Sequence, residues 1–366
     1  MTEALKLGAP VAPGGTIGIL GGGQLGRMLS LAAARLGLKT HIYSDEEDAP
    51  AFQVCSRSTQ ASYGDKAALE TFSRSCNAVT LEFENIPEQT LEFVGHLAPA
   101  NPGAAALSIT QDRYLEKAFV KNLGIPVPKH VPIGHEDAAR VAFELLSCPR
   151  AVLKTRRFGY DGKGQILVTS ESEAVDAFRK FAGALAILEE FVEFAYEASV
   201  IAARGTDGSF AAYDPPENVH GDHILRRSTV PGRLTKEQTS EAIAVAKKIA
   251  DELDYVGVLA VEFFVAKDGR LLVNEIAPRV HNSGHWTIEA CVVNQFEQHV
   301  RAIAGWPLGD PSRHADAVME NIIGEEARHW REFAGKRVGL HLYGKQEMRP
   351  GRKMGHVTTL SPLSSR

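Results

Sequence analysis

The chain has 366 residues, of which 23% are charged and 44% hydrophobic, with a formal net charge of −5 and a sequence pI near 6.2. These values are typical of a soluble globular protein of two or three domains. The Lys and Arg residues are not clustered densely enough for a general nucleic-acid surface, so we expect no nucleic-acid partner.

The cysteine pattern and the N-terminal sequence both favour the cytoplasm. The four cysteines are far apart and form no C-x-x-C pair, which argues against a cysteine zinc site and fits a reducing compartment. The first 15 residues lack the basic start and the apolar stretch of a signal peptide. The sequence contains no run of 18 apolar residues, so we expect no membrane-spanning segment.

A glycine-rich turn lies between the first predicted strand, at 16–20, and the first predicted helix, at 24–37. Gly21, Gly23 and Gly26 form a G-x-G-x-x-G pattern, which permits a tight turn and leaves backbone N–H groups facing an anion at the helix start. A second strand, at 39–44, ends beside Asp45, where a dinucleotide site has its ribose-binding acid. The motif predicts an anion site, and a nicotinamide or flavin dinucleotide is one candidate occupant.

The order of the predicted elements divides the chain into three domains. Residues 1–110 alternate strands and helices, as in a Rossmann-like α/β domain with a parallel sheet. Residues 111–310 form a mixed domain with a lid subdomain at about 150–215, and residues 311–366 predict a small β-rich domain. Further predicted strands are 78–83, 151–155, 165–168, 186–192, 197–203 and 209–214, and further predicted helices are 65–75, 112–123, 138–147, 235–253 and 284–304.

A hairpin at 257–275 carries two carboxylates. Asp268-Gly269 lies between two apolar runs and predicts a two-residue turn. With that turn, Glu262 faces Glu275 on the same side of the hairpin, at a Cβ separation of roughly 4.5–5.5 Å. Two such carboxylates repel one another, and a divalent cation removes the repulsion. Oxygen-only ligands favour Mg²⁺, or Mn²⁺, over zinc. Two unrelated glutamates on a solvated strand are the alternative interpretation.

Two other segments have features of a nucleotide site. The loop KTRRFGYDGKGQ, at 154–165, places three glycines and two lysines after a predicted strand, which suits polyphosphate, although the sequence is not a Walker loop. It predicts a mobile lid that excludes water from a labile phosphoryl group. The segment ILEEFVEFAYEASV, at 187–200, predicts an extended backbone for an adenine edge and acids for ribose hydroxyls.

These motifs, in this order, resemble the ATP-grasp ligases. Within that superfamily, the chain is similar to the N5-carboxyaminoimidazole ribonucleotide synthases of de novo purine biosynthesis. The similarity extends from residue 17 to residue 356 and includes GILGGGQLGRML, VTLEFENIP, RRFGYDGKGQ, EEFVEFAYEASV, NEIAPRVHNSGHWT and YGKQEMRPGRKMGH. The resemblance implies an N-terminal Rossmann-like pre-ATP-grasp domain, an ATP-grasp domain with a lid, and a small C-terminal domain. It also implies a homodimer.

The resemblance implies an ATP-dependent carboxylation with ATP, bicarbonate and aminoimidazole ribonucleotide as substrates and carboxyphosphate as the intermediate. The first glycine loop would then help to bind the 5′-phosphate of the ribonucleotide, and Asp45 would have no ribose role. The implied metal ligands are Glu262 and Glu275. The implied ATP contacts are Arg113, Lys154, Gly159, Tyr160, Asp161, Gly162, Lys163, Gly164, Gln165, Glu189, Glu190, Phe191, Val192, Glu197, His220, Asn274 and Glu275.

The same resemblance implies a substrate site and a small catalytic set. The substrate contacts are Gln24, Leu25, Glu82, Tyr160, Asp161, Arg279, Asn282, Ser283, His285, Arg352 and Lys353. The catalytic set is Lys154, Asp161, Arg279 and His285, with either Asp161 or His285 accepting a proton from the substrate amine. Arginine can hold a phosphate through two hydrogen bonds, which suits Arg279 and Arg352.

Three other functions remain as alternatives. A formate-using glycinamide ribonucleotide transformylase shares the ATP-grasp architecture but is not expected to combine HNSGHWT with RPGRKMGH. A nicotinamide-linked oxidoreductase would use Gly21, Gly23 and Gly26 and would leave the Glu262/Glu275 hairpin unexplained. A non-catalytic nucleotide-binding protein would bind ATP without turnover.

Overall fold

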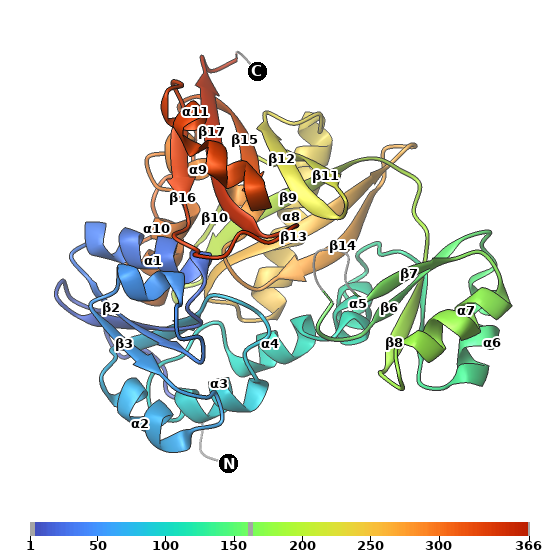
Figure 1. The fold of residues 1–366 in the computed structure, drawn as a ribbon, viewed down its shortest axis with the longest axis horizontal. Coiled ribbons are helices and arrows are strands. Elements are labelled where there is room, and N and C mark those ends of the chain that lie inside the picture. Colours follow the sequence, from blue (N-terminus) through green and yellow to red (C-terminus); the bar gives the residue numbers. More distant parts are fainter. Residues whose placement is uncertain (1–3, 160–163, 365–366) are drawn as a thin grey trace.

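The computed structural model describes residues 4–159 and 164–364 and consists of three β-sheets with helices packed against them (Figure 1). Tyr160, Asp161, Gly162 and Lys163, which the sequence places in the nucleotide lid, lie outside the described residues. None of the helices in the described parts of the chain has the length and apolarity needed to cross a bilayer.

The N-terminal sheet is parallel, as predicted, and has the strand order β3-β2-β1-β4. Its strands are β1 (Thr16–Leu20), β2 (Lys39–Ser44), β3 (Arg57–Gln60) and β4 (Ala78–Leu81). The accompanying helices are α1 (Gln24–Arg35), η1 (Pro50–Gln53), α2 (Lys66–Arg74), α3 (Glu88–Gly95) and α4 (Ala104–Thr110). The hydrophobic pattern did not predict β3, α3 or α4. The carboxyl ends of β1 and β4 lie side by side, so the glycine turn after β1 meets the segment after β4.

The second sheet is antiparallel and has the order β5-β8-β6-β7. It consists of β5 (His130–Ile133), β6 (Ala151–Thr155), β7 (Gln165–Val168) and β8 (Ala186–Glu190), with α6 (Glu136–Leu146) and α7 (Glu171–Lys180) beside it. This sheet begins at residue 130, and the next strand after β8 belongs to another sheet. We therefore propose residues 130–190 as the lid subdomain, in place of about 150–215.

The third sheet has nine strands and contains most of the candidate site. Its strands are β9 (Phe194–Arg204), β10 (Phe210–Ala212), β11 (Glu217–Gly221), β12 (Ile224–Val230), β13 (Gly257–Ala266), β14 (Leu271–Ala277), β15 (Asp316–Ile323), β16 (Gly339–Leu342) and β17 (Lys353–Ser361). The C-terminal strands continue this sheet because β15 pairs with β12, at Thr229 opposite Val318. Its helices are α8 (Lys236–Glu252), η3 (Gly324–His329) and α11 (Trp330–Ala334).

The predicted long helix at 284–304 is wrong. The segment instead forms η2 (Asn282–Gly284), α9 (Thr287–Ala290) and α10 (Gln295–Ile303). The chain becomes extended at Cys291, which forms a bridge with Arg313, and α10 then begins anew. Asn294 caps this helix by accepting hydrogen bonds from the N–H groups of Phe296 and Glu297, each at 3.0 Å. Ser283 of η2 then contacts Ser199 of β9 at 2.7 Å, while Gln295 at the start of α10 bonds to the backbone of His281.

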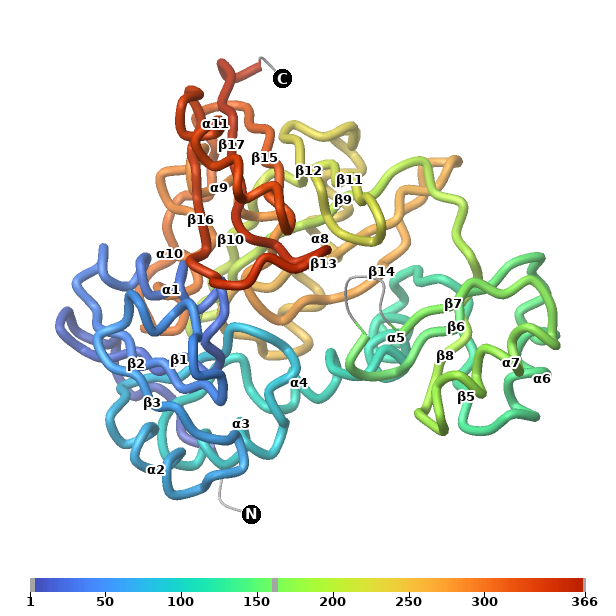
Figure 2. Tube along the Cα trace, in the orientation of Figure 1, coloured from blue at the N-terminus to red at the C-terminus, as the bar shows by residue number. Residues whose placement is uncertain are grey.

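The lid subdomain stands apart from the other two parts of the molecule, at the right of Figure 1. In Figure 2 the chain runs toward it through α4 and α5 (Arg113–Asn122) and leaves it by the connection into β9. The parallel sheet and the C-terminal strands lie together at the other end of the molecule. The arrangement agrees with the expected α/β and α+β fold class, with a parallel N-terminal sheet, a lid sheet and C-terminal strands.

Candidate functional site

Glu262 on β13 and Glu275 on β14 are directly opposed, as predicted, but the predicted turn is wrong. The N–H of Ala266 donates to the carbonyl of Arg270 at 2.9 Å, so the loop is residues 267–269 rather than two residues. Gly269, at φ 87°, supplies the left-handed position that such a three-residue loop requires.

A bulge restores the pairing of the two carboxylates. Near the turn, Phe263 pairs with Val273, which places the strands one residue out of the predicted register. The next pair is Glu262 with Glu275, so Asn274 is the extra residue on β14. A bulge can direct a side chain to a position that regular strand pairing would not give it, and bulges occur often beside active sites.

The carboxylate pair has a guanidinium and a histidine as close neighbours, which compensate its charge only in part. Nη1 of Arg113 lies 3.2 Å from Glu275, and Nε2 of His281 lies 3.1 Å from Glu262. Burial, and then the charge of Glu275, raise the pKa of Glu262 to about 8. The site therefore favours added positive charge, and a divalent cation would supply it.

Glu262 and Glu275 would supply only part of the coordination of a metal ion. In the described part of the chain, no group of three or more His, Cys, Asp or Glu side chains is placed to hold a metal ion. Mg²⁺ is commonly held by one or two carboxylates together with waters and phosphate oxygens, rather than by a complete protein cage. The donor set of Glu262 and Glu275 fits that arrangement.

A second buried group of charges joins the lid subdomain to β14. Lys154 on β6 donates to Glu189 on β8 at 2.8 Å, and Lys117 on α5 lies 3.8 Å from the other oxygen of Glu189. Lys117 also donates to the carbonyl of Asn274 at 2.5 Å. Burial alone would raise the pKa of Glu189, but the charges of Lys117 and Lys154 outweigh it and lower this pKa to about 2. Glu189 is therefore a buried anion held between two lysines.

Among the described residues, several buried polar atoms in this region have no hydrogen-bond partner. They are Oε1 of Glu189, Oδ1 of Asn274, and both Oδ1 and Nδ2 of Asn282. Buried polar groups in folded proteins are nearly always paired, and leaving one unpaired costs about 1–3 kcal/mol. All three residues were among the predicted ATP or substrate contacts. The unpaired atoms indicate a polar ligand that would complete their hydrogen bonds.

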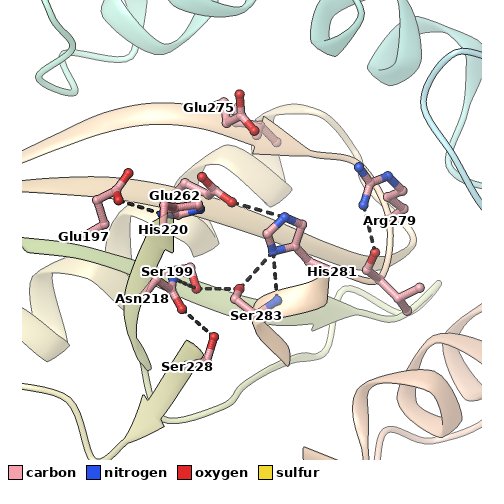
Figure 3. A network of polar contacts seen from close by, with 12 residues as sticks. Glu197, Ser199, Asn218, His220, Ser228, Glu262, Glu275, Arg279, His281 and Ser283 are labelled. Carbon is pink, nitrogen blue, oxygen red and sulfur yellow. Dashed lines mark hydrogen bonds and ion pairs between the residues drawn. The ribbon is translucent and has the colours of Figure 1, made fainter. Parts of the chain in front are cut away.

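Glu197 on β9 and His220 on β11 form a hydrogen bond at 2.7 Å beside the carboxylate pair (Figure 3). Burial disfavours a charged His220, but the bond to Glu197 outweighs this effect and raises the pKa of His220. Two residues of the lid loop have contacts outside it. The carbonyl of Gly159 accepts from Arg113 of α5 at 3.1 Å, and Gln165 contacts His223 at 3.2 Å. The described ends of the lid loop therefore reach the same region as β11 and β14.

The glycine turn after β1 encloses a carboxylate of the protein itself. The N–H groups of Gly23 and Gly26 donate to Glu82 at 2.8 and 3.1 Å. A Cβ on Gly21 would lie 2.4 Å from Cγ of Glu82, and a Cβ on Gly23 would lie 2.7 Å from its Oε1. Close approach of Glu82 thus accounts for glycine at both positions. Glu82 already occupies these two N–H groups, so the expected contact with a substrate phosphate would fall to Gln24 and Leu25 and stays a prediction.

Positive side chains lie near Glu82 on the C-terminal part of the chain. Lys345 is mostly buried, and its pKa is lowered to about 8 by that burial and by the charges of Arg352 and Lys353, while Glu82 opposes the shift. Nζ of Lys345 donates to the carbonyl of Lys353 at 2.9 Å. Gln53 on η1 donates to the carbonyl of Gly344 at 3.0 Å, which ties this turn to the N-terminal domain. Together these cations form a candidate phosphate site.

Arg279 follows β14 and forms an ion pair with Glu84 across the boundary of the two domains. Burial would disfavour both charges, but each stabilises the other, so the pKa of Glu84 is lowered and that of Arg279 is raised. Nη2 of Arg279 lies 2.9 Å from Oε1 of Glu84. Arg279 therefore remains a fixed cation between the glycine turn and the carboxylate pair.

His285 is fully buried and has a defined protonation pattern. Gln295 accepts the N–H of His281 at 2.9 Å and donates to its carbonyl at 2.7 Å, which fixes the orientation of the Gln295 amide. That amide also donates to Nδ1 of His285 at 3.0 Å. Burial lowers the pKa of His285 well below its usual value. Neutral His285 thus carries its proton on Nε2, which argues against His285 as the acceptor of the substrate proton.

Three family models match successive parts of the chain. A ribonucleotide synthetase preATP-grasp domain matches residues 15–111, an ATP-grasp domain matches 118–296, and a phosphoribosylaminoimidazole carboxylase C-terminal domain matches 317–365. An N5-carboxyaminoimidazole ribonucleotide synthase of Brucella melitensis is 49% identical over 353 residues, which cover 96% of this chain and 97% of that protein. The chain belongs to the N5-carboxyaminoimidazole ribonucleotide synthase family.

Solved structures of this synthase family have the same fold. A crystal structure of an N5-carboxyaminoimidazole ribonucleotide synthetase in complex with ADP superposes with a TM-score of 0.91 at 43% identity and covers 97% of this chain and 94% of that one. An N5-carboxyaminoimidazole synthase from Aspergillus clavatus, in complex with ADP and 5-aminoimidazole ribonucleotide, gives a TM-score of 0.89 at 29% identity, with 96% and 94% covered.

Some residues proposed from the synthase resemblance have other contacts in the structure. The side chain of Leu25 lies in the hydrophobic core, so only its backbone is available to a ligand. Glu190 accepts the N–H of Lys129 at 2.8 Å, and the Phe191 ring lies 4.2 Å from the guanidinium of Arg150. Gln24 begins α1, and Val192 lies in the connection between β8 and β9.

Sequence reasoning did not assign site roles to Lys117, His281 or Lys345. The sequence patterns gave His281 no role of its own, whereas it lies 3.1 Å from Glu262. Lys117 follows Arg113 by four residues, a spacing that places both on one side of a helix and that could have indicated its role. Lys345 stands in YGK, before the RPGRK stretch, and no local pattern distinguishes it from an exposed lysine.

Proposed function

We propose that this chain catalyses the ATP-dependent carboxylation of 5-aminoimidazole ribonucleotide by bicarbonate, which yields N5-carboxyaminoimidazole ribonucleotide, ADP and phosphate. The observation that carries the proposal is the Glu262/Glu275 pair, which lies opposed beside buried and unpaired polar atoms in a chain of this family. A ligase of this kind requires a divalent cation, a polyphosphate and a second substrate at one site.

ATP would lie between the lid subdomain and β14. Lys154 and Arg113 would provide positive charge for its phosphates, and the unpaired oxygens of Glu189 and Asn274 would accept hydrogen bonds from it. Glu197 and His220 would lie toward its ribose. We retain Gly159, Gly164 and Gln165, together with the lid residues outside the described part of the chain, as proposed contacts. Closure of the lid would exclude water from carboxyphosphate.

Mg²⁺, or Mn²⁺, would be held by Glu262 and Glu275. When bound, the metal would neutralise the charge of the triphosphate and of the developing phosphoryl group. His281 lies 3.1 Å from Glu262 and Arg113 lies 3.2 Å from Glu275, so each carboxylate has a neighbour that would help to orient it. The residues present therefore fit the metal.

The ribonucleotide would lie toward the parallel sheet. Lys345, Arg352, Lys353 and Arg279 would attract its phosphate. Glu82 accepts two backbone hydrogen bonds and still has lone pairs for the hydroxyl groups of a sugar. Asn282 and Ser283 on η2 would contact the same substrate. This arrangement assigns the substrate phosphate mainly to the C-terminal cations.

The reaction would proceed by transfer of the γ-phosphoryl group to bicarbonate. Carboxyphosphate then releases phosphate and CO₂, and the amine of the ribonucleotide attacks the carbon of CO₂. One proton leaves the amine as the new C–N bond forms. We propose Asp161 as its acceptor, because Nδ1 of His285 is already engaged by Gln295. Lys154 and Arg279 would stabilise negative charge on the phosphoryl group and the carboxylate.

Specific observations disfavour the alternatives. A dinucleotide pyrophosphate at the first glycine turn would face the carboxylate of Glu82, and like charges repel. A formate-dependent transformylase would accept glycinamide ribonucleotide, and the family shown here is that of the carboxyaminoimidazole synthases. We further propose that the chain is cytoplasmic and forms a homodimer, in line with the cysteine pattern and with the family resemblance.

The test is a coupled assay of ADP release with ATP, Mg²⁺ and bicarbonate, with and without aminoimidazole ribonucleotide. We expect ADP release that depends on the ribonucleotide and on bicarbonate. Release that depends on formate and glycinamide ribonucleotide would favour the transformylase. ATP binding without any release would favour a non-catalytic protein, and reduction or oxidation of a nicotinamide cofactor would favour the oxidoreductase.

A further inference from the structure

A chain of hydrogen bonds runs from the interior of the large sheet to His281, whose Nε2 lies 3.1 Å from the carboxylate of Glu262 (Figure 3). Its members come from β12, β11, β9, η2 and the residue before η2, and are, in order, Ser228, Asn218, Ser199, Ser283 and His281. Ser228, Ser199 and Ser283 are fully buried, and Asn218 is 5% exposed. No ligand contact of the proposed reaction accounts for Asn218, Ser199 or Ser228.

The distances along the chain are those of good hydrogen bonds. Ser228 lies 2.7 Å from Oδ1 of Asn218, and Nδ2 of Asn218 lies 2.9 Å from Ser199. The hydroxyls of Ser199 and Ser283 are 2.7 Å apart. Ser283 Oγ lies 2.8 Å from Nδ1 of His281, and Nε2 of His281 lies 3.1 Å from Glu262.

Two groups beside His281 define which atom donates and which accepts in each hydrogen bond of this series. Nε2 of His281 lies 3.1 Å from Oε1 of Glu262, and an ionised Glu262 can only favour a proton on Nε2. The backbone N–H of Ser283 points at Nδ1 from 3.4 Å, and a backbone N–H can only donate. Nδ1 is therefore an acceptor, and neutral His281 carries its proton on Nε2.

The same direction then follows at every other link. Because Nδ1 accepts, the hydroxyl of Ser283 donates to it, and Ser283 Oγ in turn accepts from Ser199. The hydroxyl of Ser199 has then been used as a donor, so Ser199 accepts from the amide of Asn218. The Asn218 amide is the group that starts the series, because its NH₂ can donate but cannot accept.

We propose that Asn218 is a positioning residue that, through Ser199 and Ser283, holds His281 as the Nε2–H tautomer aimed at Glu262. The proposal rests on the proposed function in one respect: Glu262 is taken as a metal ligand. A hydrogen-bonded histidine orients such a carboxylate, and loss of a supporting contact of this kind typically costs 10–100-fold in metal affinity. The position of the proton on neutral His281 does not depend on whether the protein catalyses the proposed carboxylation.

The Asn218→Asp variant tests the direction of the chain. A carboxylate keeps the shape of the amide but has no N–H to donate, so the Ser199 hydroxyl would turn toward residue 218. Ser283 would then donate to Ser199, and the favoured His281 tautomer would become Nδ1–H. We expect a roughly tenfold change in the tautomer ratio, the worth of about one net hydrogen bond. Ser228→Ala is the matched control, because it removes a buried hydroxyl at the far end and leaves the direction unchanged.

The measurement is ¹⁵N NMR of histidine-labelled, nucleotide-free protein at about pH 9, with the His281 resonances identified by their loss in His281→Gln. The expected result is Nε2–H in the wild type and in Ser228→Ala, and a shift toward Nδ1–H in Asn218→Asp. Nδ1–H in the wild type would overturn the proposal without any variant. An unchanged tautomer in a folded Asn218→Asp would also overturn it.

A titration with Mn²⁺ gives a second measurement on the same proteins. We expect Asn218→Asp to weaken Mn²⁺ binding about tenfold and Ser228→Ala to change it less than about twofold. Equal weakening in both variants would indicate a merely structural role and would overturn the proposal. Failure of the ADP-release assay would remove the proposed function but would leave the tautomer measurement standing, so the two failures are distinguishable.

Discussion

Glu82, which follows β4, accepts a hydrogen bond from the backbone N–H of Gly23 at the start of α1. This contact explains why a G-x-G-x-x-G sequence occurs here without a dinucleotide. The N-terminus of a helix favours negative charge, and the protein supplies that charge from its own side chain. The position of Glu82, between the N-terminal turn and the C-terminal cations, follows from this contact.

The Gly23→Ala variant should weaken ribonucleotide binding. Its Cβ would lie 2.7 Å from Oε1 of Glu82, so the carboxylate must move. We expect the KM for the ribonucleotide to rise about tenfold or more, with the KM for ATP nearly unchanged, because the nucleotide site lies on other elements. Steady-state kinetics with each substrate varied in turn is the measurement. Gly64→Ala, where the nearest atom would be 3.8 Å away, is the control. Equal rises in both KM values would contradict the assignment.

The Glu275→Gln variant should lose metal-dependent turnover and should gain stability without metal. The amide removes one of two opposed carboxylates, which lowers their repulsion in the metal-free protein. We expect kcat to fall by at least about a hundredfold, and Tm without Mg²⁺ to rise. ADP release and thermal denaturation are the measurements, with the exposed Glu193→Gln as the control. Near-normal turnover would exclude Glu275 as a metal ligand.

Stability without metal should depend on pH through Glu262. Its pKa is raised to about 8 by burial and by the charge of Glu275, whereas an unfolded glutamate has a pKa of about 4.3. Between these values the folded protein binds the proton and the unfolded protein does not, so the contribution of Glu262 to the free energy of unfolding falls as the pH rises from about 4.5 to about 8. Glu116, whose pKa is also raised to about 8 by burial, acts in the same direction.

Tm measured across this pH range, without divalent metal, checks the dependence. Above about pH 7, where the buried histidines are largely neutral in both states, Glu262→Gln should show a shallower fall than the wild type, and Glu116 and Glu82 should contribute to the remaining fall. Glu189 contributes no slope here, because its pKa of about 2 leaves it ionised in both states above about pH 5. Identical slopes in Glu262→Gln and the wild type would show that Glu262 titrates normally.

The Gln53→Ala variant should affect only the ribonucleotide side of the site. Gln53 donates to the carbonyl of Gly344, next to Lys345, and also accepts from Arg27 at 2.8 Å. Without it, the turn that carries Lys345 loses its tie to the N-terminal domain. We expect a several-fold rise in the KM for the ribonucleotide, little change for ATP, and a nearly unchanged Tm. Gln60→Ala, an exposed change on β3, is the control, and a matching rise in that variant would refute the role of Gln53.

Sequence analysis predicted the helices and strands whose hydrophobic residues recur at regular spacing. Strands β1, β2 and β4 of the first domain, the helix at 113–122 and the hairpin at 257–277 were all expected from local patterns. The break within 284–304 was not, because Cys291 becomes extended through a bridge to Arg313, far along the chain. Local periodicity carries no information about a contact of that kind.

The hairpin shows how a correct pairing can follow from a wrong turn. The sequence suggested a two-residue turn, and the structure has a three-residue loop with a bulge at Asn274 that cancels the offset. The glycine turn was a correct anion site, but its occupant, Glu82, comes from a strand that only the fold brings near. The contacts of Lys345 and His281 likewise depend on tertiary structure, which no motif in one sequence specifies.

The pairing of β12 with β15 has a consequence for dissecting this molecule into fragments. A protein truncated before residue 316 would expose the edge of β12. The unpaired backbone N–H and C=O groups of that edge could then pair with strands of other molecules. The same cut would remove Lys345, Arg352 and Lys353. The C-terminal segment is therefore no detachable module, and recombinant versions without it should aggregate rather than persist as a smaller nucleotide-binding protein.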